Sequence, residues 1–259
     1  MFIKILVCVL AGFGAGIGTG FAGLSAATVI SPMLMILLDV PAYEAVGIAL
    51  ASDVLASALS AVTYAKNKNI DLKNGLVMMV TVLVFTVFGS WVASFVKATA
   101  MELVSLAFML VLGLKFILWP VMKTEQAEEE TNRVRFVIVS VACGMFVGFT
   151  CGFIGIGGGM MMLLLLTSVL GYELKTAVGT SVFIMSFTAF TGATSRFVMG
   201  GLPNWLYLDV CVVSTLVFAL IASRIANMAK AKTLNRIVGL VLVATCITMV
   251  IIETVKVVW

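Results

Sequence analysis

Histidine is absent from this chain of 259 residues, and charged residues make up only 11% of it. The chain therefore lacks the commonest general base, the commonest zinc ligand and the usual pH sensor near neutrality. Its five cysteines lie in apolar stretches, and none is paired at a metal-ligand spacing, so we interpret them as small core residues. We predict that the protein is not an enzyme, and no motif indicates a metal or a cofactor.

Apolar residues fill the place of the missing charges. Hydrophobic residues make up 62% of the chain and the mean hydropathy is +1.21, whereas about a quarter of the residues of a soluble domain are charged. We predict an all-α polytopic protein of the cell inner (plasma) membrane. The net charge of +4 is then explained by basic residues in the connections, rather than by a nucleic-acid partner. The apolar segments run approximately over 2–22, 27–38, 45–65, 74–96, 103–121, 136–156, 160–170, 177–199, 205–223 and 236–255.

The sequence contains an internal repeat. The motif Ala-Val-Gly at 45–47 recurs at 177–179, and four glycines recur at the same offset of 132 residues: Gly12, Gly16, Gly20 and Gly23 as Gly144, Gly148, Gly152 and Gly155. This predicts two transmembrane repeats, 1–122 and 136–259, of about five hydrophobic segments each, joined by a charged cytoplasmic linker at 123–135. An internal repeat in so apolar a chain is typical of secondary transporters.

The second segment of each half is too short to cross the membrane, since a span needs about 20 helical residues. We expect it to dip in and turn back, so that each half crosses an odd number of times and the two repeats are inverted. If it only completes the crossing begun by the first segment, the repeats are parallel instead. The inverted arrangement puts both termini outside the cytoplasm.

The distribution of lysine and arginine favours the inverted arrangement by the positive-inside rule. The parallel one divides these residues about nine to six. The inverted one leaves four on the outer side, Lys4, Lys97, Arg196 and Lys256, and gathers eleven on the other: Lys66, Lys68, Lys73, Lys123, Arg133, Arg135, Lys175, Arg224, Lys230, Lys232 and Arg236.

A run of glycines marks the strongest candidate site. Five of the eight residues at 152–159 are glycine, and each costs about 1 kcal/mol relative to alanine inside a helix. We therefore predict a broken helix near the membrane midplane, whose free N–H groups and following half-helix can bind an anion. The stretch 16–27 is its first-half counterpart. The alternative is close helix packing through small residues, which is the favoured interpretation of Gly12, Gly16 and Gly20.

Two further positions are candidates. Thr180 and Ser181 follow Gly179 at the start of a segment, although hydroxyls in membrane helices also bond their own backbone. Asp53 lies near the middle of an apolar segment, where an acid is functional by default. It is a candidate to carry a proton or to coordinate a driving cation; the alternative is a buried acid hydrogen-bonded to Ser52 or Ser57. Arg196, which the repeat pairs with Tyr64, is expected to snorkel to the interface rather than line an anion entrance.

The glycine run at 152–159, the motif at 177–181 and their degenerate first-half copies resemble the TauE/SafE sulfite exporter family, over nearly the whole chain. The resemblance implies a permease for small sulfur-containing or organic anions, such as sulfite or sulfoacetate. The first half departs from the pattern, with Gly-Leu-Ser-Ala-Ala at 23–27 in place of a fuller glycine run, so the halves are not expected to contribute equally. The substrate-binding residues implied are Gly23, Ser25, Gly155, Gly157, Gly158, Gly159, Gly179, Thr180 and Ser181.

The sequence thus predicts a secondary transporter that moves a small anion by alternating access between glycine-broken re-entrant or half helices. Its expected partners are the anion, the lipid bilayer, a coupling proton or cation bound at Asp53, and a second copy in a homodimer. Two alternatives stay open: an anion channel, which needs no coupling residue, and a non-transporting membrane assembly subunit, whose glycines serve packing alone.

Overall fold

The computed structural model describes residues 2–96, 133–154 and 158–228, together with the single residues 111, 114, 240, 243 and 247. Gly155, Gly157, the linker residues 123–132 and most of the two segments 103–121 and 236–255 lie outside this described part. Within it the chain is all helical, as predicted, with no strand.

The helices follow the predicted segments. The first half contains α1 (Phe2–Ala22), α2 (Ala27–Leu38), α3 (Ala42–Lys66) and α4 (Leu72–Ala93), and the second contains α6 (Arg133–Ile154), α7 (Gly158–Ser168), α8 (Leu174–Gly200) and α9 (Trp205–Met228). Five of them, α1, α3, α4, α8 and α9, are long and apolar enough to cross a membrane. The second helix of each half has only 12 and 11 residues, which confirms that this segment is short.

The repeat extends from the sequence to the helix boundaries. Corresponding helices of the two halves begin 131 to 133 residues apart, from the pair Phe2 and Arg133 to the pair Leu72 and Trp205. The halves therefore consist of the same series of one long helix, one short helix and two further long helices.

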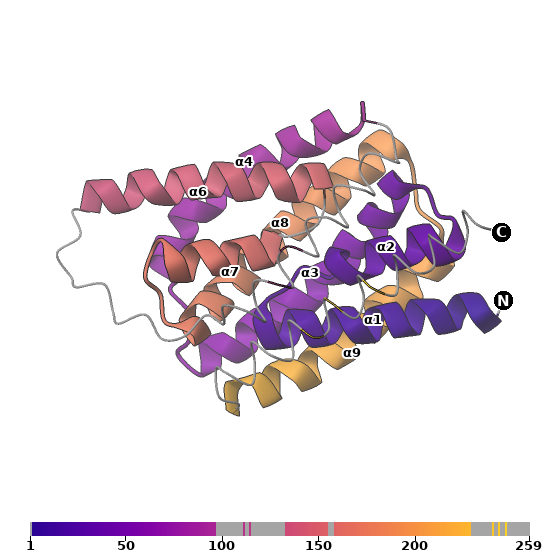
Figure 1. Ribbon diagram of the computed structural model, residues 1–259, viewed down its shortest axis with the longest axis horizontal. Coiled ribbons are helices and arrows are strands. Elements are labelled where there is room, and N and C mark those ends of the chain that lie inside the picture. Colours follow the sequence, from indigo (N-terminus) through magenta and orange to yellow (C-terminus); the bar gives the residue numbers. More distant parts are fainter. Residues whose placement is uncertain are drawn as a thin grey trace.

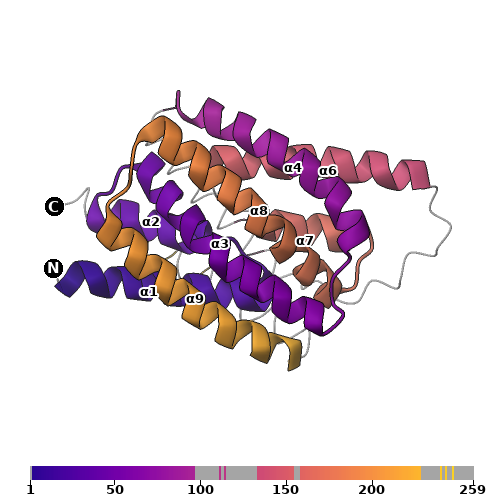
Figure 2. The same cartoon turned by 180° about the vertical axis from the view of Figure 1, so that it is seen from behind.

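The two short helices return toward opposite ends of the molecule. In Figures 1 and 2, α1 starts at the end where the N-terminus lies and α2 turns back toward it. In the same views α6 starts at the other end and α7 turns back toward that end. Between these hairpins, α3 and α8 pack side by side and run in opposite directions. Their apolar spans are the most buried, with 67% of the residues inside the protein against 33–39% in α1, α4 and α9.

Two interfaces of the bundle are copies of each other. Helix α1 packs on α9 and α6 packs on α4, and the repeat exchanges these two pairs. Both contacts rely on glycine, because a Cβ on Gly16 would lie 2.7 Å from the carbonyl oxygen of Thr215 and one on Gly144 would lie 3.1 Å from that of Met78. Gly12 and Gly20 also face α9, so the packing interpretation of the first-half glycines is confirmed.

This packing predicts unequal effects of alanine along α1. Gly16→Ala forces a methyl group against the backbone of α9 and should lower the free energy of unfolding by about 1–3 kcal/mol. Gly14→Ala is the matched control, since its nearest neighbour is a side-chain methyl, Cγ1 of Val29, at 3.1 Å. Thermal unfolding of the purified protein in detergent should show a lower midpoint for Gly16→Ala alone. Equal midpoints for the two variants would contradict the close α1–α9 contact.

Candidate functional site

The first helix break lies between α1 and α2. Gly23 follows the last residue of α1 with φ at +62°, a left-handed conformation that favours glycine. Its N–H donates to the carbonyl of Thr19 at 2.9 Å, and the hydroxyl of Thr19 donates to the carbonyl of Leu24 at 2.8 Å. Backbone groups at the break are thus satisfied within the protein, as a membrane-embedded chain requires. In the second half, α6 ends at Ile154 and α7 begins at Gly158.

The two breaks meet at the centre of the bundle. Gly159, at the start of α7, packs directly against the carbonyl oxygen of Gly23. Gly23 in turn packs on α8, where a Cβ in its place would lie 2.5 Å from Oγ of Ser181. Three of the predicted residues, Gly23, Gly159 and Ser181, therefore share one location, although they come from three different segments of the chain.

Asp53 lies at this first break. It is fully buried near the middle of α3, and its Oδ1 accepts hydrogen bonds from Ser57 at 2.8 Å and from Thr19 at 3.5 Å. The hydroxyl of Ser25 and the N–H of Ala26, just before α2, also interact with the carboxylate. Its second oxygen, Oδ2, has no hydrogen-bond partner among the described residues. The predicted contact with Ser57 is confirmed, whereas the alternative partner Ser52 donates to its own helix at Ile48.

The motif at 179–181 divides between two places. Gly179 packs against the carbonyl of Asn69, and Oγ1 of Thr180 accepts the N–H of Asp71 at 3.0 Å. Both residues therefore hold the connection between α3 and α4. Only Ser181 faces the break, and its hydroxyl donates to the carbonyl of Val178, the self-bonding that was the alternative interpretation.

The connection that Thr180 holds is fixed further by Asp71. Its carboxylate caps the start of α4 by accepting from the N–H of Asn74 at 3.1 Å, and it also accepts the hydroxyl of Tyr172 at 2.9 Å. Burial, together with the negative charge of Asp71, raises the pKa of Tyr172, so this phenol stays a donor. These contacts join the ends of α3, α4 and α8 away from the helix breaks.

Arg196 does not snorkel, so that expectation is wrong. Its side chain is 1% exposed, and Nη2 donates to the carbonyls of Gly152 at 2.8 Å and of Phe153 at 3.2 Å, at the end of α6. At the equivalent position of the first half, Tyr64 donates to the carbonyl of Gly20 at 3.2 Å. The repeat pairs both donors and both acceptors. Sequence reasoning noted the pairing of Tyr64 with Arg196 but missed this shared role, which the matching offset of Gly20 and Gly152 could have indicated.

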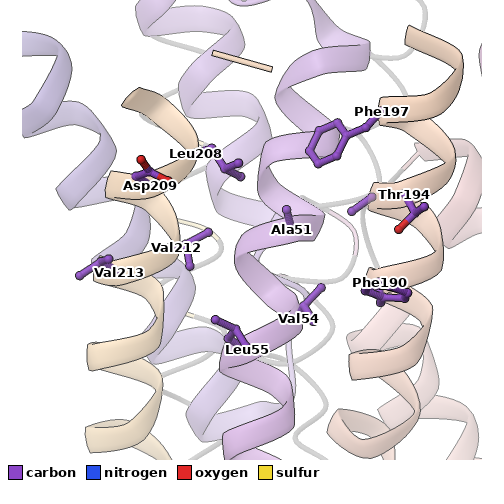
Figure 3. Close-up of a pocket in the computed structure, with 11 residues that line it drawn as sticks. Ala51, Val54, Leu55, Phe190, Thr194, Phe197, Leu208, Asp209, Val212 and Val213 are labelled. Carbon is purple, nitrogen blue, oxygen red and sulfur yellow. The ribbon is translucent and has the colours of Figure 1, made fainter. Parts of the chain in front are cut away.

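An apolar groove lies apart from this site. It occupies about 490 Å³ between α3, α8 and α9, with side chains such as Leu55, Phe190 and Val213 on its walls and Asp209 as its one charged residue (Figure 3). None of the predicted site residues lines it. The described part of the chain also contains no cluster of three or more potential metal ligands of the His, Cys, Asp or Glu type.

A bundle of long apolar helices around two central helix breaks is the architecture of a membrane transporter. The chain belongs to the TauE/SafE sulfite exporter family, whose family model matches residues 8–249. It is similar to the probable membrane transporter protein YunE of Bacillus subtilis, at 26% identity over 93% of this chain and 95% of the relative. A probable membrane transporter protein of Haemophilus influenzae is 28% identical over 96% of this chain and 99% of the relative.

YdhB of Bacillus subtilis, also a probable membrane transporter protein, is 22% identical over 86% of this chain and 91% of the relative. No solved structure gives a significant match. The protein is therefore a multi-pass membrane transporter of the TauE/SafE type.

The contact between the two breaks predicts a difference between neighbouring glycines of α7. Gly159→Ala sets a methyl group against the Gly23 backbone and should separate the breaks, at a cost of about 1–3 kcal/mol. Gly158→Ala meets mainly the side chain of Cys151, at 2.9 Å, which can shift. The yield of monodisperse protein in size-exclusion chromatography and its unfolding midpoint should both fall for Gly159→Ala and change little for Gly158→Ala. The reverse order would place the contact elsewhere.

Proposed function

We propose that this protein is a secondary transporter that moves a small sulfur-containing or organic anion, such as sulfite or sulfoacetate, by alternating access coupled to protons. The observation that carries the proposal is the position of Asp53. This fully buried acid of a central helix interacts with the α1–α2 break, at the place where that break contacts α7 and Ser181. A carboxyl group takes up and releases a proton, so a substrate bound at the breaks and a proton bound at Asp53 influence each other.

The preference for an anion follows from the short helices. Helices α2 and α7 both begin at the central breaks, and neither carries an acidic residue in its first turn. The N-terminus of a helix has unsatisfied N–H groups and a positive partial charge, so two such ends favour a negatively charged ligand. The preference for sulfur-containing anions rests on the family description alone.

Alternating access fits the internal repeat. The hairpins α1–α2 and α6–α7 start from opposite ends of the bundle (Figure 1), and basic residues gather at the end where α3 finishes and α8 begins, including Lys66, Lys68 and Lys175. These features support two inverted repeats, with the basic end in the cytoplasm. In such a transporter the substrate site is reached from either side by exchanging the conformations of the two halves.

The topology can be measured at two equivalent positions. Lys66 ends α3, and Leu202 follows the end of α8; both are exposed. In a cysteine-free background, Lys66→Cys and Leu202→Cys should react with a membrane-impermeant maleimide from opposite sides of the cell membrane, with Leu202→Cys labelled in intact cells. Labelling of both from one side would show parallel repeats and remove the shared geometry of the site.

The coupling role predicts the behaviour of Asp53→Asn. In proteoliposomes, uptake of labelled sulfite or sulfoacetate by the unmodified protein should increase when a pH gradient is imposed. Asp53→Asn keeps the shape of the side chain but cannot exchange a proton, so the increase should disappear. Undiminished gradient-driven flux in the variant would reject the coupling role. Flux that persists in the variant but no longer responds to the gradient, at channel-like rates, would favour an anion channel.

Two serines of α3 provide a matched control. Ser57 donates to Asp53, whereas Ser52 is equally buried but donates to its own helix. Loss of a hydrogen bond to a charged group costs about 1.5–3 kcal/mol, so Ser57→Ala should change the pH dependence of uptake. Ser52→Ala should leave that pH dependence unchanged. The same pH profile for both variants would show that uptake does not depend on the environment of Asp53.

A further inference from the structure

We propose that Arg196, together with the hydroxyl of Tyr43, binds the negatively charged group of the transported anion beside the start of α7. This inference rests on the proposed function, because it assigns the residue that recognises the substrate. It adds a side-chain cation to a site for which the sequence suggested only backbone N–H groups and hydroxyls.

The first argument is the incomplete pairing of a buried cation. Arg196 is 1% exposed, and its Nη2 uses the carbonyls of Gly152 and Phe153. Its Nε and Nη1 are buried as well and have no hydrogen-bond partner among the described residues, where Arg196 also forms no ion pair. Burial of a charge without an opposite charge costs several kcal/mol. An anion that accepts from Nε or Nη1 would supply the missing charge and hydrogen bonds together.

The second argument is the comparison with the first half. Tyr64, the repeat equivalent of Arg196, makes the equivalent contact to Gly20 with a neutral hydroxyl. A neutral donor is therefore sufficient to hold the end of a broken helix. The positive charge and the additional N–H donors of Arg196 exceed what that structural role requires, which points to a second role in the second half.

The third argument is the position of Tyr43. The guanidinium carbon of Arg196 lies 4.6 Å from the centre of the Tyr43 ring, a distance typical of a cation–π contact. This ring packs against Gly200, where a Cβ would lie 2.6 Å from its edge. The Tyr43 hydroxyl is buried and has no partner among the described residues. An unpaired donor thus lies on the ring that contacts an incompletely paired cation, and an oxyanion can accept from both.

The fourth argument is the difference between the two short helices. At the start of α2, the carboxylate of Asp53 interacts with the N–H of Ala26. The repeat equivalent of Asp53 is Met185, whose sulfur packs against Gly159 at the start of α7. The positive end of α7 therefore has no carboxylate at the equivalent position. Cys151 connects the two parts of the proposed site, because it packs against Gly158 and interacts electrostatically with Arg196.

The chemistry of these groups defines the ligand class. The available groups are N–H and O–H donors and a positive charge, so the ligand is a small oxyanion with several acceptor oxygens, such as a sulfite, sulfonate or carboxylate group. The carbonyls of Gly152 and Phe153 hold Nη2 and would repel an anion on that side, so the ligand is expected to bind at Nε and Nη1.

Binding can be measured without transport. We would follow the unfolding temperature of the detergent-purified protein during titration with sodium sulfite or sodium sulfoacetate, with sodium gluconate at equal ionic strength as the control. The unmodified protein should show saturable stabilisation by sulfite or sulfoacetate. Arg196→Tyr installs the residue that serves the first half, keeps a donor for Gly152 and removes the charge. It should weaken anion binding by about 10- to 100-fold, the effect of losing a charge-assisted hydrogen bond.

Three further variants make the result specific. Arg196→Gln, which also keeps a donor without the charge, should lose binding like Arg196→Tyr, and it replaces that variant if the tyrosine prevents folding. Tyr43→Phe should weaken binding by up to about 10-fold. Tyr64→Phe removes the equivalent contact of the first half and should leave anion affinity unchanged.

Unchanged affinity in a folded Arg196→Tyr or Arg196→Gln variant would overturn the proposal, and so would absence of any stabilisation of the unmodified protein by both anions. Stabilisation that depends on Arg196, in a protein that shows no flux in proteoliposomes, would support the binding site while rejecting the transport function. The two failures are therefore distinguishable.

Discussion

The structure depends on how polar backbone groups are satisfied where a helix breaks inside an apolar bundle. In the hydrocarbon region no water is available for free carbonyl and N–H groups, and each unsatisfied group is costly. Here the central helices supply the partners: Tyr64 of α3 donates to the end of α1, and Arg196 of α8 donates to the end of α6. This requirement explains why α3 and α8 are the most buried spans and why their polar side chains face the breaks rather than the surface.

Much of the fold could be predicted from the sequence because it rests on periodic or repeated features. The offset of 132 residues between the glycines reappears in the helix starts, and the short apolar segments became α2 and α7. Glycines spaced four apart, such as Gly12, Gly16 and Gly20, lie on one helix face, so their packing role could also be inferred. These predictions needed only local sequence and the geometry of a helix.

The candidate site was less predictable because it depends on which way a side chain points in three dimensions. Gly179, Thr180 and Ser181 were treated as one motif, but successive residues of a helix face different directions. Thr180 consequently contacts the α3–α4 connection, while Ser181 faces Gly23. Snorkelling was expected for Arg196 because it lies near a segment end. That rule omits the competing demand of the carbonyls of α6, which lie within reach of the guanidinium and cannot be located from sequence.

The two halves share a fold but differ in charge, and this difference suggests how transport could be coupled. The first half contributes Asp53 where the second has Met185, and the second contributes Arg196 where the first has Tyr64. With an ionised Asp53 the empty site has no net charge. On our proposals it again has none when a monovalent anion binds Arg196 and a proton binds Asp53. With the anion alone, or the proton alone, the site carries one uncompensated charge in a buried environment, which is costly. A conformational exchange that buries the site would then favour the empty and the doubly loaded states, so that the anion and the proton cross together.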